Sequence, residues 1–218
     1  MDLFPLYLTL KVSIVATIFS VTIGLILAWL MAKHDFLGKG LIDALIMQPL
    51  VIPPTVLGYY ILVILGRSSP LGRFLEDGLG ITLVFTWRGA VIAAVVASLP
   101  LFVKPARVAL EAVDKNLENA ARLLGRTEWQ VWRTITLPLA WRGIAAGAIL
   151  SFARATGEFG ATLMVAGNIP GTTQTMPIAI YDAVQMGDMA SANTLVIIIT
   201  LFSVSVLYFV NRFTRGLY

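Results

Sequence analysis

One arginine and one glutamate, in an otherwise apolar stretch, are the charged residues best placed to do chemistry away from water. Arg154 lies eleven residues after Gly143, which is about 16 Å along a helix that rises about 1.5 Å per residue. Glu158 follows Arg154 by one helical turn. If the stretch crosses a bilayer whose apolar core is about 30 Å thick, Arg154 lies near its middle. A charge at that depth is costly and faces protein or a water-filled cavity.

Two interpretations of this pair stay open. In the first, Arg154 and Glu158 neutralise each other across one turn, and the pair is structural. In the second, Arg154 adds positive potential to a path for anions, while Glu158, flanked by Gly157 and Gly160, shapes a gate between subunits. The sequence does not separate the two.

The residues needed for enzymatic chemistry are missing. No phosphate-binding loop occurs, because the Gly38-Lys39 pair has Lys33 where the first glycine of that motif belongs and Gly40 where a hydroxyl residue belongs. The single histidine, His34, lies in a polar turn beside Asp35 and has no nucleophile next to it. The chain has no cysteine, which excludes disulfides and thiolate metal sites. We therefore expect no catalytic residue, no metal site and no cofactor in this chain.

A polar, arginine-rich segment from Glu118 to Pro138 predicts two short helices joined at an elbow. Leu117, Ala120, Ala121 and Leu124 form an apolar stripe at helical spacing. Glu118 and Arg122 are predicted to form an ion pair on the other face. Gly125 then ends the first helix, since glycine accepts the left-handed conformation found there.

The second short helix is predicted from its own start signal. Thr127 and Gln130 have the spacing of a capping box. Trp129 and Trp132 fall on one side of this helix, as expected at a membrane interface.

Composition places these features in an integral membrane protein. Hydrophobic residues make up 58% of the 218 residues, charged residues 13%, and the mean hydropathy is +0.85, whereas soluble domains carry about 25% charged residues. Each predicted span needs about 20 apolar residues. The fold class is therefore all-α, with five transmembrane helices over residues 10–31, 42–65, 87–108, 143–167 and 192–210.

Cations set the expected orientation, because positive residues are enriched in cytoplasmic loops. With the N-terminus outside, the outer loops hold only Arg67, Arg73 and Arg88, and the elbow and the C-terminus are cytoplasmic. The net charge of +4 is explained by this topology, so we expect no nucleic-acid partner. The cations on the cytoplasmic side are Lys33, Lys39, Lys104, Arg107, Lys115, Arg122, Arg126, Arg133, Arg142, Arg212 and Arg215.

Prolines and glycines mark breaks in the predicted spans. Pro53 and Pro54 crowd the second span and Pro100 interrupts the third. Such breaks are tolerated where protein or cavity water satisfies the freed carbonyl groups, so they indicate either a bent lining or plain structural kinks. The segment Gly167–Gly187 is too short to span and predicts a re-entrant or capping hairpin, with a surface loop as the alternative. We assign to the path or gate Pro53, Pro54, Ser98, Arg154, Glu158 and Gly160.

The elbow resembles the "EAA" loop of the permeases of bacterial ABC importers, whose pattern ends in I-x-L-P. One position departs, since Asn119 stands in place of the acid and Glu118 is its neighbour. In that family the loop couples the permease to a cytoplasmic ATPase; the alternative is an amphipathic helix that rests on lipid. The residues that we assign to ATPase coupling are Glu118, Ala120, Ala121, Gly125, Arg126, Ile135, Leu137 and Pro138.

Within the importers, the resemblance extends over nearly the whole chain and is closest to the molybdate permeases, in the CysTW-like subfamily. FTWRGAVIAAVVASLP from Phe85, FARATGEFGATL from Phe152 and GNIPGTTQTMPIAIY from Gly167 carry it. It implies one type I permease domain over residues 1–218, with the coupling loop at 114–140, in the bacterial inner membrane. The substrate is then molybdate, or the near-identical tungstate; sulfate or thiosulfate is the alternative.

The resemblance also implies partners. These are a second copy of the chain, two ATPase subunits that bind ATP and Mg²⁺, and a periplasmic or lipid-anchored protein that captures the oxyanion. A secondary transporter or a channel are the rival classes. The first is expected to show paired half-repeats and more intramembrane acids than Glu158, and the second has no need of a coupling elbow.

Overall fold

The computed structural model describes residues 3–215, and this part of the chain is helical and contains no strand. The all-α prediction is therefore confirmed. In chain order the elements are α1 (Phe4–Lys33), α2 (Lys39–Met47), η1 (Gln48–Leu50), α3 (Pro54–Leu65), α4 (Pro70–Arg73), η2 (Phe74–Gly78), α5 (Trp87–Glu111), α6 (Lys115–Leu123), α7 (Glu128–Val131), η3 (Trp132–Thr136), α8 (Leu137–Thr156), α9 (Gly160–Ala166), α10 (Met176–Gln185) and α11 (Met189–Arg215).

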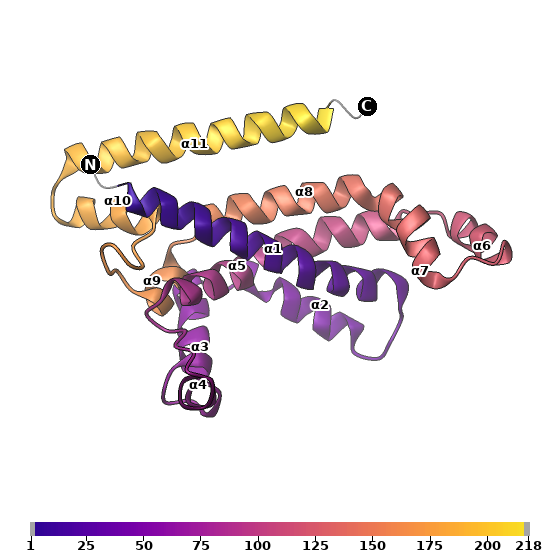
Figure 1. Ribbon diagram of the computed structural model, residues 1–218, viewed down its shortest axis with the longest axis horizontal. Helices are drawn as coiled ribbons and strands as arrows, with labels where there is room; N and C mark the ends of the chain where they lie inside the picture. The colour runs from indigo at the N-terminus through magenta and orange to yellow at the C-terminus, as the bar shows by residue number, and fades with distance from the viewer. Residues whose placement is uncertain (1–2, 216–218) are drawn as a thin grey trace.

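Helices α1, α5 and α8 form a bundle along the long axis of the molecule (Figure 1). Helix α5 is the most buried of them, because it presents small residues such as Ala90, Ala94 and Ala97 to its neighbours. Its Phe102 is fully buried beside two glycines. A Cβ at Gly24 would lie 2.4 Å from the Phe102 ring, and one at Gly147 would lie 2.8 Å from the Phe102 carbonyl oxygen. Close helix packing through glycine and alanine is the usual arrangement in membranes.

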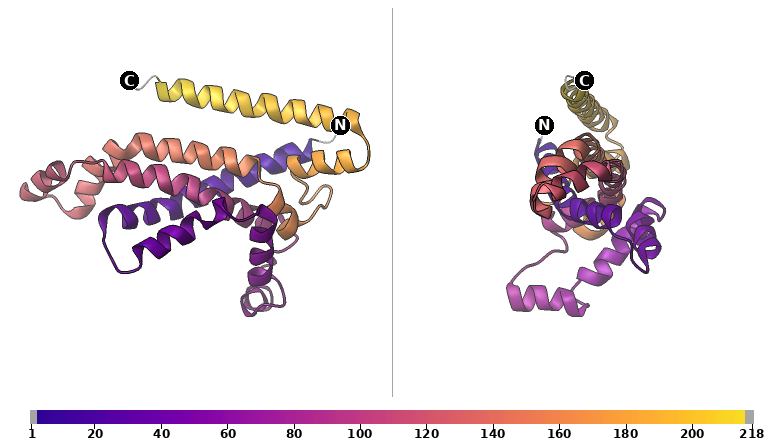
Figure 2. Two further views of the ribbon diagram at one scale, coloured as in Figure 1. Left: turned by 180° about the vertical axis from the view of Figure 1, so that it is seen from behind. Right: turned by 90° about the vertical axis from the view of Figure 1, so that its right-hand side faces the viewer.

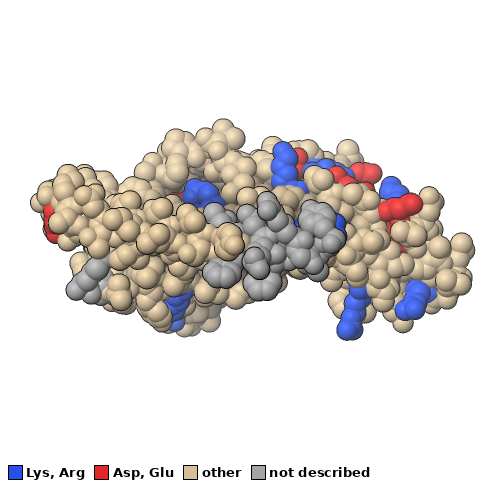
Figure 3. Space-filling view, turned by 90° about the horizontal axis from the view of Figure 1, so that it is seen from above, with Lys and Arg blue, Asp and Glu red and all other residues tan. Residues whose placement is uncertain are grey.

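The bundle has two ends that carry different elements. The elbow, residues 114–140, projects from one end, and we call this the elbow end. The N-terminus of α1 and helix α10 lie at the opposite end (Figures 1 and 2). In the face shown in Figure 3, lysines, arginines and acids gather toward the elbow end, while much of the other half is uncharged.

Four helical stretches of the described chain are long and apolar enough to span a membrane, and a fifth span exists if one bent pair is counted. The runs predicted at residues 10–31, 87–108 and 192–210 are confirmed as parts of α1, α5 and α11. Helix α11 lies beside the bundle with little of its surface covered (Figure 1). A multi-pass membrane protein is the architecture that follows.

The second predicted span is not continuous. Helix α2 with η1 is separated from α3 by residues 51–53 and bent relative to it by 114°. The cause is the Pro53-Pro54 pair, since Pro53 is extended with ψ of 138° and neither proline can donate a backbone hydrogen bond. Helix α3 therefore runs across the bundle axis (Figure 1).

The fourth predicted span also has different limits. The prediction placed it at residues 143–167, whereas the helix that reaches Thr156 starts in the elbow and the chain breaks again before α9. Gly157 terminates α8, and its N–H donates to the Ala153 carbonyl. Arg154 therefore lies in the last turn of a helix, next to a break in the chain.

The segment Gly167–Gly187 forms a packed cap at the opposite end of the bundle. Its helix α10 buries Met176, Ile178 and Ala179. The backbone N–H of Met176 donates to Thr9 Oγ1 on α1 at 2.8 Å. This segment is therefore packed onto α1, which agrees with the capping prediction and not with a plain surface loop.

Candidate functional site

The first candidate site is the elbow, and its turn is built as predicted. Gly125 has a φ of +80°. Its N–H donates to the Arg122 carbonyl at 2.9 Å, and the Arg126 N–H donates to the Ala121 carbonyl at 3.1 Å. Together these two bonds form the Schellman motif that closes α6. Glycine is favoured here because it adopts the left-handed conformation without the steric cost of a Cβ.

The capping box that starts α7 is also confirmed. The Thr127 N–H donates to Gln130 Oε1 at 2.9 Å, and the Gln130 N–H donates to Thr127 Oγ1 at 3.4 Å. Local hydrogen bonds therefore fix the start of α7 directly after the Gly125 turn.

Helix α7 continues into α8 through one π-helical turn, η3. The Leu137 N–H donates to the Trp132 carbonyl, five residues earlier. Pro138 explains the wider turn, because it lacks an N–H and cannot satisfy the Thr134 carbonyl in an α-helix. The Ile135-x-Leu137-Pro138 part of the motif therefore lies inside a helix, at the base of the elbow.

Apolar side chains project from the elbow without cover. Leu123, Leu124 and Trp129 are 89%, 85% and 68% exposed. Gly125 and Arg126, which join the two helices, are exposed as well. Exposed apolar side chains grouped on a charged projection indicate a surface that meets another molecule.

The predicted ion pair between Glu118 and Arg122 is wrong. Glu118 is only 4% exposed, and its Oε1 accepts hydrogen bonds from Lys33 Nζ at 2.7 Å and Thr136 Oγ1 at 2.6 Å. Arg122 instead binds both carboxylate oxygens of Glu128, at 2.7 and 3.0 Å. The reason is that α6 packs its Glu118 side on the end of α1 and on η3, so that side is not free for Arg122.

Burial and the hydrogen-bond partners shift the pKa of the Glu118 carboxyl group in opposite directions. Desolvation raises its pKa, but the hydrogen bonds from Lys33 and Thr136 and the Lys33 charge outweigh that effect, and the pKa is lowered. Glu118 is therefore ionised at neutral pH. It is held inside the elbow.

The apolar stripe and the two tryptophans are also arranged differently from the prediction. Ala121 is buried, but Leu117, Ala120 and Leu124 are exposed. Trp132 packs edge-on against Trp29 of α1, with ring centroids 6.3 Å apart, while Trp129 is largely exposed.

The second candidate site is where the two broken spans meet. Helix α3 begins at Pro54 and α9 begins at Gly160. A Cβ on Gly160 would lie 2.9 Å from Pro54 Cβ, and one on Gly58 would lie 2.7 Å from Met164 Cβ. The structure thus brings together Pro53, Pro54, Glu158 and Gly160, which are far apart in sequence, around two chain breaks.

The Arg154–Glu158 ion pair is present. Arg154 Nη1 lies 2.6 Å from Glu158 Oε2, and the Glu158 side chain is 1% exposed against 28% for Arg154. Glu158 Oε1 also accepts from the Ala161 N–H at 2.8 Å and so caps α9. The glutamate therefore connects the end of α8 to the start of α9, while part of the Arg154 side chain stays accessible.

Ser98 lies elsewhere. It is fully buried, and its Oγ is 3.1 Å from Ser20 Oγ in the contact between α1 and α5. In this structure it joins two helices, and its role in a path stays a prediction.

Sequence reasoning missed Lys11, a cation inside the first span. Its Nζ lies 3.9 Å from the centroid of the Trp87 ring, an attractive cation–π arrangement. The sequence signal that could have found it is a lysine at the second position of the span predicted over residues 10–31.

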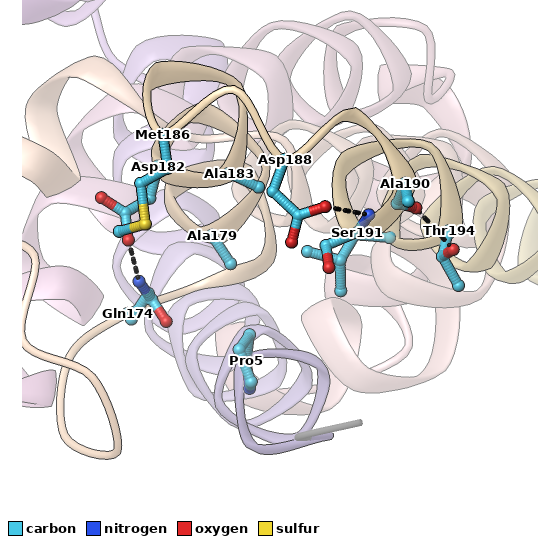
Figure 4. Close-up of a pocket in the computed structure, with 11 residues that line it drawn as sticks. Pro5, Gln174, Ala179, Asp182, Ala183, Met186, Asp188, Ala190, Ser191 and Thr194 are labelled. Carbon is cyan, nitrogen blue, oxygen red and sulfur yellow. Dashed lines mark hydrogen bonds between the residues drawn. The ribbon is translucent and has the colours of Figure 1, made fainter.

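A hollow of about 490 Å³ lies at the opposite end, between α10, α11 and the start of α1. Figure 4 shows its polar residues, with Gln174 bonded to Asp182 and Asp188 accepting from the Ser191 N–H at 3.0 Å. Because its charged residues are carboxylates, this hollow does not suit an anion.

The fold and the elbow together define a class, the helical permeases of ABC importers. A solved bacterial alginate ABC transporter in complex with its periplasmic protein matches 99% of this chain and 78% of its own with a TM-score of 0.79 at 17% identity. The methionine ABC transporter MetNI matches 98% of this chain and 94% of its own with a TM-score of 0.73 at 18% identity.

Sequence comparison then gives the family. Residues 20–217 match the family described as "Binding-protein-dependent transport system inner membrane component". This chain belongs to that family. The molybdenum transport permease ModB of Escherichia coli K12 is 49% identical over 92% of this chain and 88% of its own length. The sulfate permease CysT of Salmonella typhimurium is 33% identical over 93% of this chain and 73% of its own length.

Proposed function

We propose that this chain is the membrane permease subunit of an ATP-driven importer that carries molybdate into the bacterial cytoplasm. The main support for a role as a permease subunit is the elbow, which is a pre-formed projection with Leu123, Leu124 and Trp129 exposed at its surface. The high identity to molybdate permeases supports the substrate, and tungstate, a dianion of the same shape, is expected to compete.

The partners follow from that role. The elbow docks into a separate ATPase that binds ATP and Mg²⁺. The exposed Ala120, Gly125 and Arg126 belong to the docking region, and the buried Ala121 lies behind it. Two permease chains and two ATPases form the transporter, with an oxyanion-capture protein on the outside. The gathering of cations at the elbow end supports an orientation with the elbow in the cytoplasm and the N-terminus outside.

The path for the anion passes the two chain breaks. Arg154 supplies positive potential next to Glu158, Gly160, Pro53 and Pro54, and its side chain is 28% exposed. Because Arg154 is 28% exposed and its partner Glu158 only 1%, a dianion in a low-dielectric path comes closer to the cation than to the carboxylate. Two copies of the chain, related by a two-fold axis, would place two such arginines around one path.

Uptake by the reconstituted complex tests this function. Vesicles that contain the permease, its ATPase and its capture protein should accumulate radioactive molybdate only with ATP inside. Unlabelled tungstate should compete and sulfate should not. Competition by sulfate at equal concentration would instead favour the alternative of a sulfate permease, to which the similarity with CysT corresponds.

A further inference from the structure

Glu118 connects three elements that the chain does not join directly. It belongs to α6, its partner Lys33 is the last residue of α1, and its partner Thr136 is the last residue of the π turn η3. Both donors, Lys33 Nζ and Thr136 Oγ1, bind the same carboxylate oxygen of Glu118, Oε1. The side chains of Lys33 and Glu118 are 17% and 6% exposed, so the contact is largely closed to water.

Few other contacts hold α6 to the bundle. Among its residues only Glu118 and Ala121 are buried, and Ala121 has no polar side chain. The side-chain hydrogen bond that links α6 to α1 is therefore the one at the Glu118 carboxylate. The Trp29–Trp132 contact lies alongside and joins α1 to η3.

The contact includes the last residue of a π turn, Thr136. A single π turn inside an α-helix has a wider ring of hydrogen bonds and often marks a functional position. Thr136 ends this turn, and its hydroxyl donates to Glu118. A displacement of Glu118 thus pulls on the segment where α7 continues into α8.

We infer that Glu118 is a positioning residue that transmits movement of the elbow to α1 and to the base of α8. It lies inside the elbow, behind the exposed apolar side chains, and does not itself contact the ATPase. This inference rests on the proposed function, because transmission has meaning only if the elbow docks on an ATPase.

The experiment uses the complete complex in vesicles and measures molybdate uptake and ATP hydrolysis in the same sample. Thr136→Val removes one hydroxyl without changing the shape of the side chain, and Glu118→Gln removes the charge. For both we expect normal retention of the ATPase and continued hydrolysis, with uptake per ATP lower by about fivefold, the scale of losing one net hydrogen bond. Thr136→Ser keeps the hydroxyl and should keep the wild-type ratio.

Lys39→Met is the matched control. Lys39 forms an ion pair of the same length, 2.7 Å, and its hydrogen bond goes to the exposed Asp35 and not to a residue of the elbow. It should leave uptake per ATP unchanged, whereas Lys33→Met should lower it. Assembly of each complex is checked by gel filtration before reconstitution.

The outcomes separate the inference from the proposed function. If wild-type vesicles take up no molybdate or retain no ATPase, the proposed function fails. If the wild type transports and Thr136→Val and Glu118→Gln keep its uptake per ATP, the inference is overturned. Loss of ATPase retention in Glu118→Gln together with Thr136→Val would also overturn it, because Glu118 would then shape the docking surface itself.

Discussion

A side chain at Gly125 could destabilise the elbow in two ways, through backbone strain or through a steric clash. Its φ of +80° penalises a Cβ, but no atom lies within 4 Å of where that Cβ would be. The turn therefore needs glycine for its backbone, and steric space inside this chain is not the reason. A partner that fills the open space would add a second cost, which only the assembled complex can reveal.

Gly125→Val should weaken docking of the ATPase through the backbone alone. The left-handed conformation costs a β-branched residue about 1–2 kcal/mol, so we expect a detergent pull-down to retain clearly less ATPase. Gly125→Asn should retain most of it, because asparagine tolerates this conformation. Gly38 is the matched control, since it has a φ of +89° and equally open surroundings outside the elbow. Full ATPase retention by Gly125→Val would count against docking at this turn.

Arg154 and Glu158 require a test in which both residues change. Arg154→Gln leaves a carboxylate that is 1% exposed without its cation, and breaking such a pair costs about 3–5 kcal/mol. We expect low yield and a lowered melting temperature in detergent. Arg154→Gln combined with Glu158→Gln should regain the yield but not the uptake, because the path has lost its positive charge. Normal uptake by the double variant would limit the pair to a structural role.

At the scale of elements, the sequence predicted the helices and the elbow but not how two of the spans break. Hydropathy placed α1, α5 and α11, and the Gly125 and Thr127 signals placed the turn, because these patterns are local. The Pro53-Pro54 pair marked a break in the second span, but the position of α3 after its 114° bend and the break after Thr156 go with the packing of α3 against α9. No local pattern encodes that contact.

The same limit explains why Glu118 was misassigned. Its i, i+4 neighbour Arg122 is the obvious partner in an isolated helix. Lys33 is 85 residues away in sequence and reaches Glu118 only because the end of α1 lies under the elbow. Local spacing cannot rank a distant partner above a near one.

The contact between α3 and α9 can be tested through Gly58. A Cβ there would lie 2.7 Å from Met164 Cβ and 2.9 Å from Ala161 Cα, and a backbone atom cannot move aside. We expect Gly58→Ala to lower the melting temperature in detergent by several degrees and to reduce uptake. Gly40→Ala is the control, since Gly40 is helical with open surroundings and alanine there gains about 1 kcal/mol of helix propensity. Equal melting temperatures for both variants would mean that α3 and α9 are not packed this closely.

At the scale of the whole molecule, the asymmetry between the two ends of the bundle is the main evidence for direction. In the face shown in Figure 3, charged residues gather toward the elbow end, which also carries the exposed apolar elbow, while the opposite end carries the α10 cap and a hollow whose charged residues are Asp182 and Asp188. An importer needs such a difference, because its two ends meet different partners.

Cysteine labelling can establish the orientation, since the chain contains no cysteine. Thr172→Cys lies in the exposed turn before α10, and Leu124→Cys lies at an 85% exposed position of the elbow. A membrane-impermeant maleimide should label Thr172→Cys in intact cells and Leu124→Cys only after the inner membrane is opened. Ala97→Cys, at a fully buried position of α5, should stay unlabelled in both and reports any unfolding. Labelling of Leu124→Cys in intact cells would place the elbow outside, away from ATP, and would remove both the proposed coupling to an ATPase and the role inferred for Glu118.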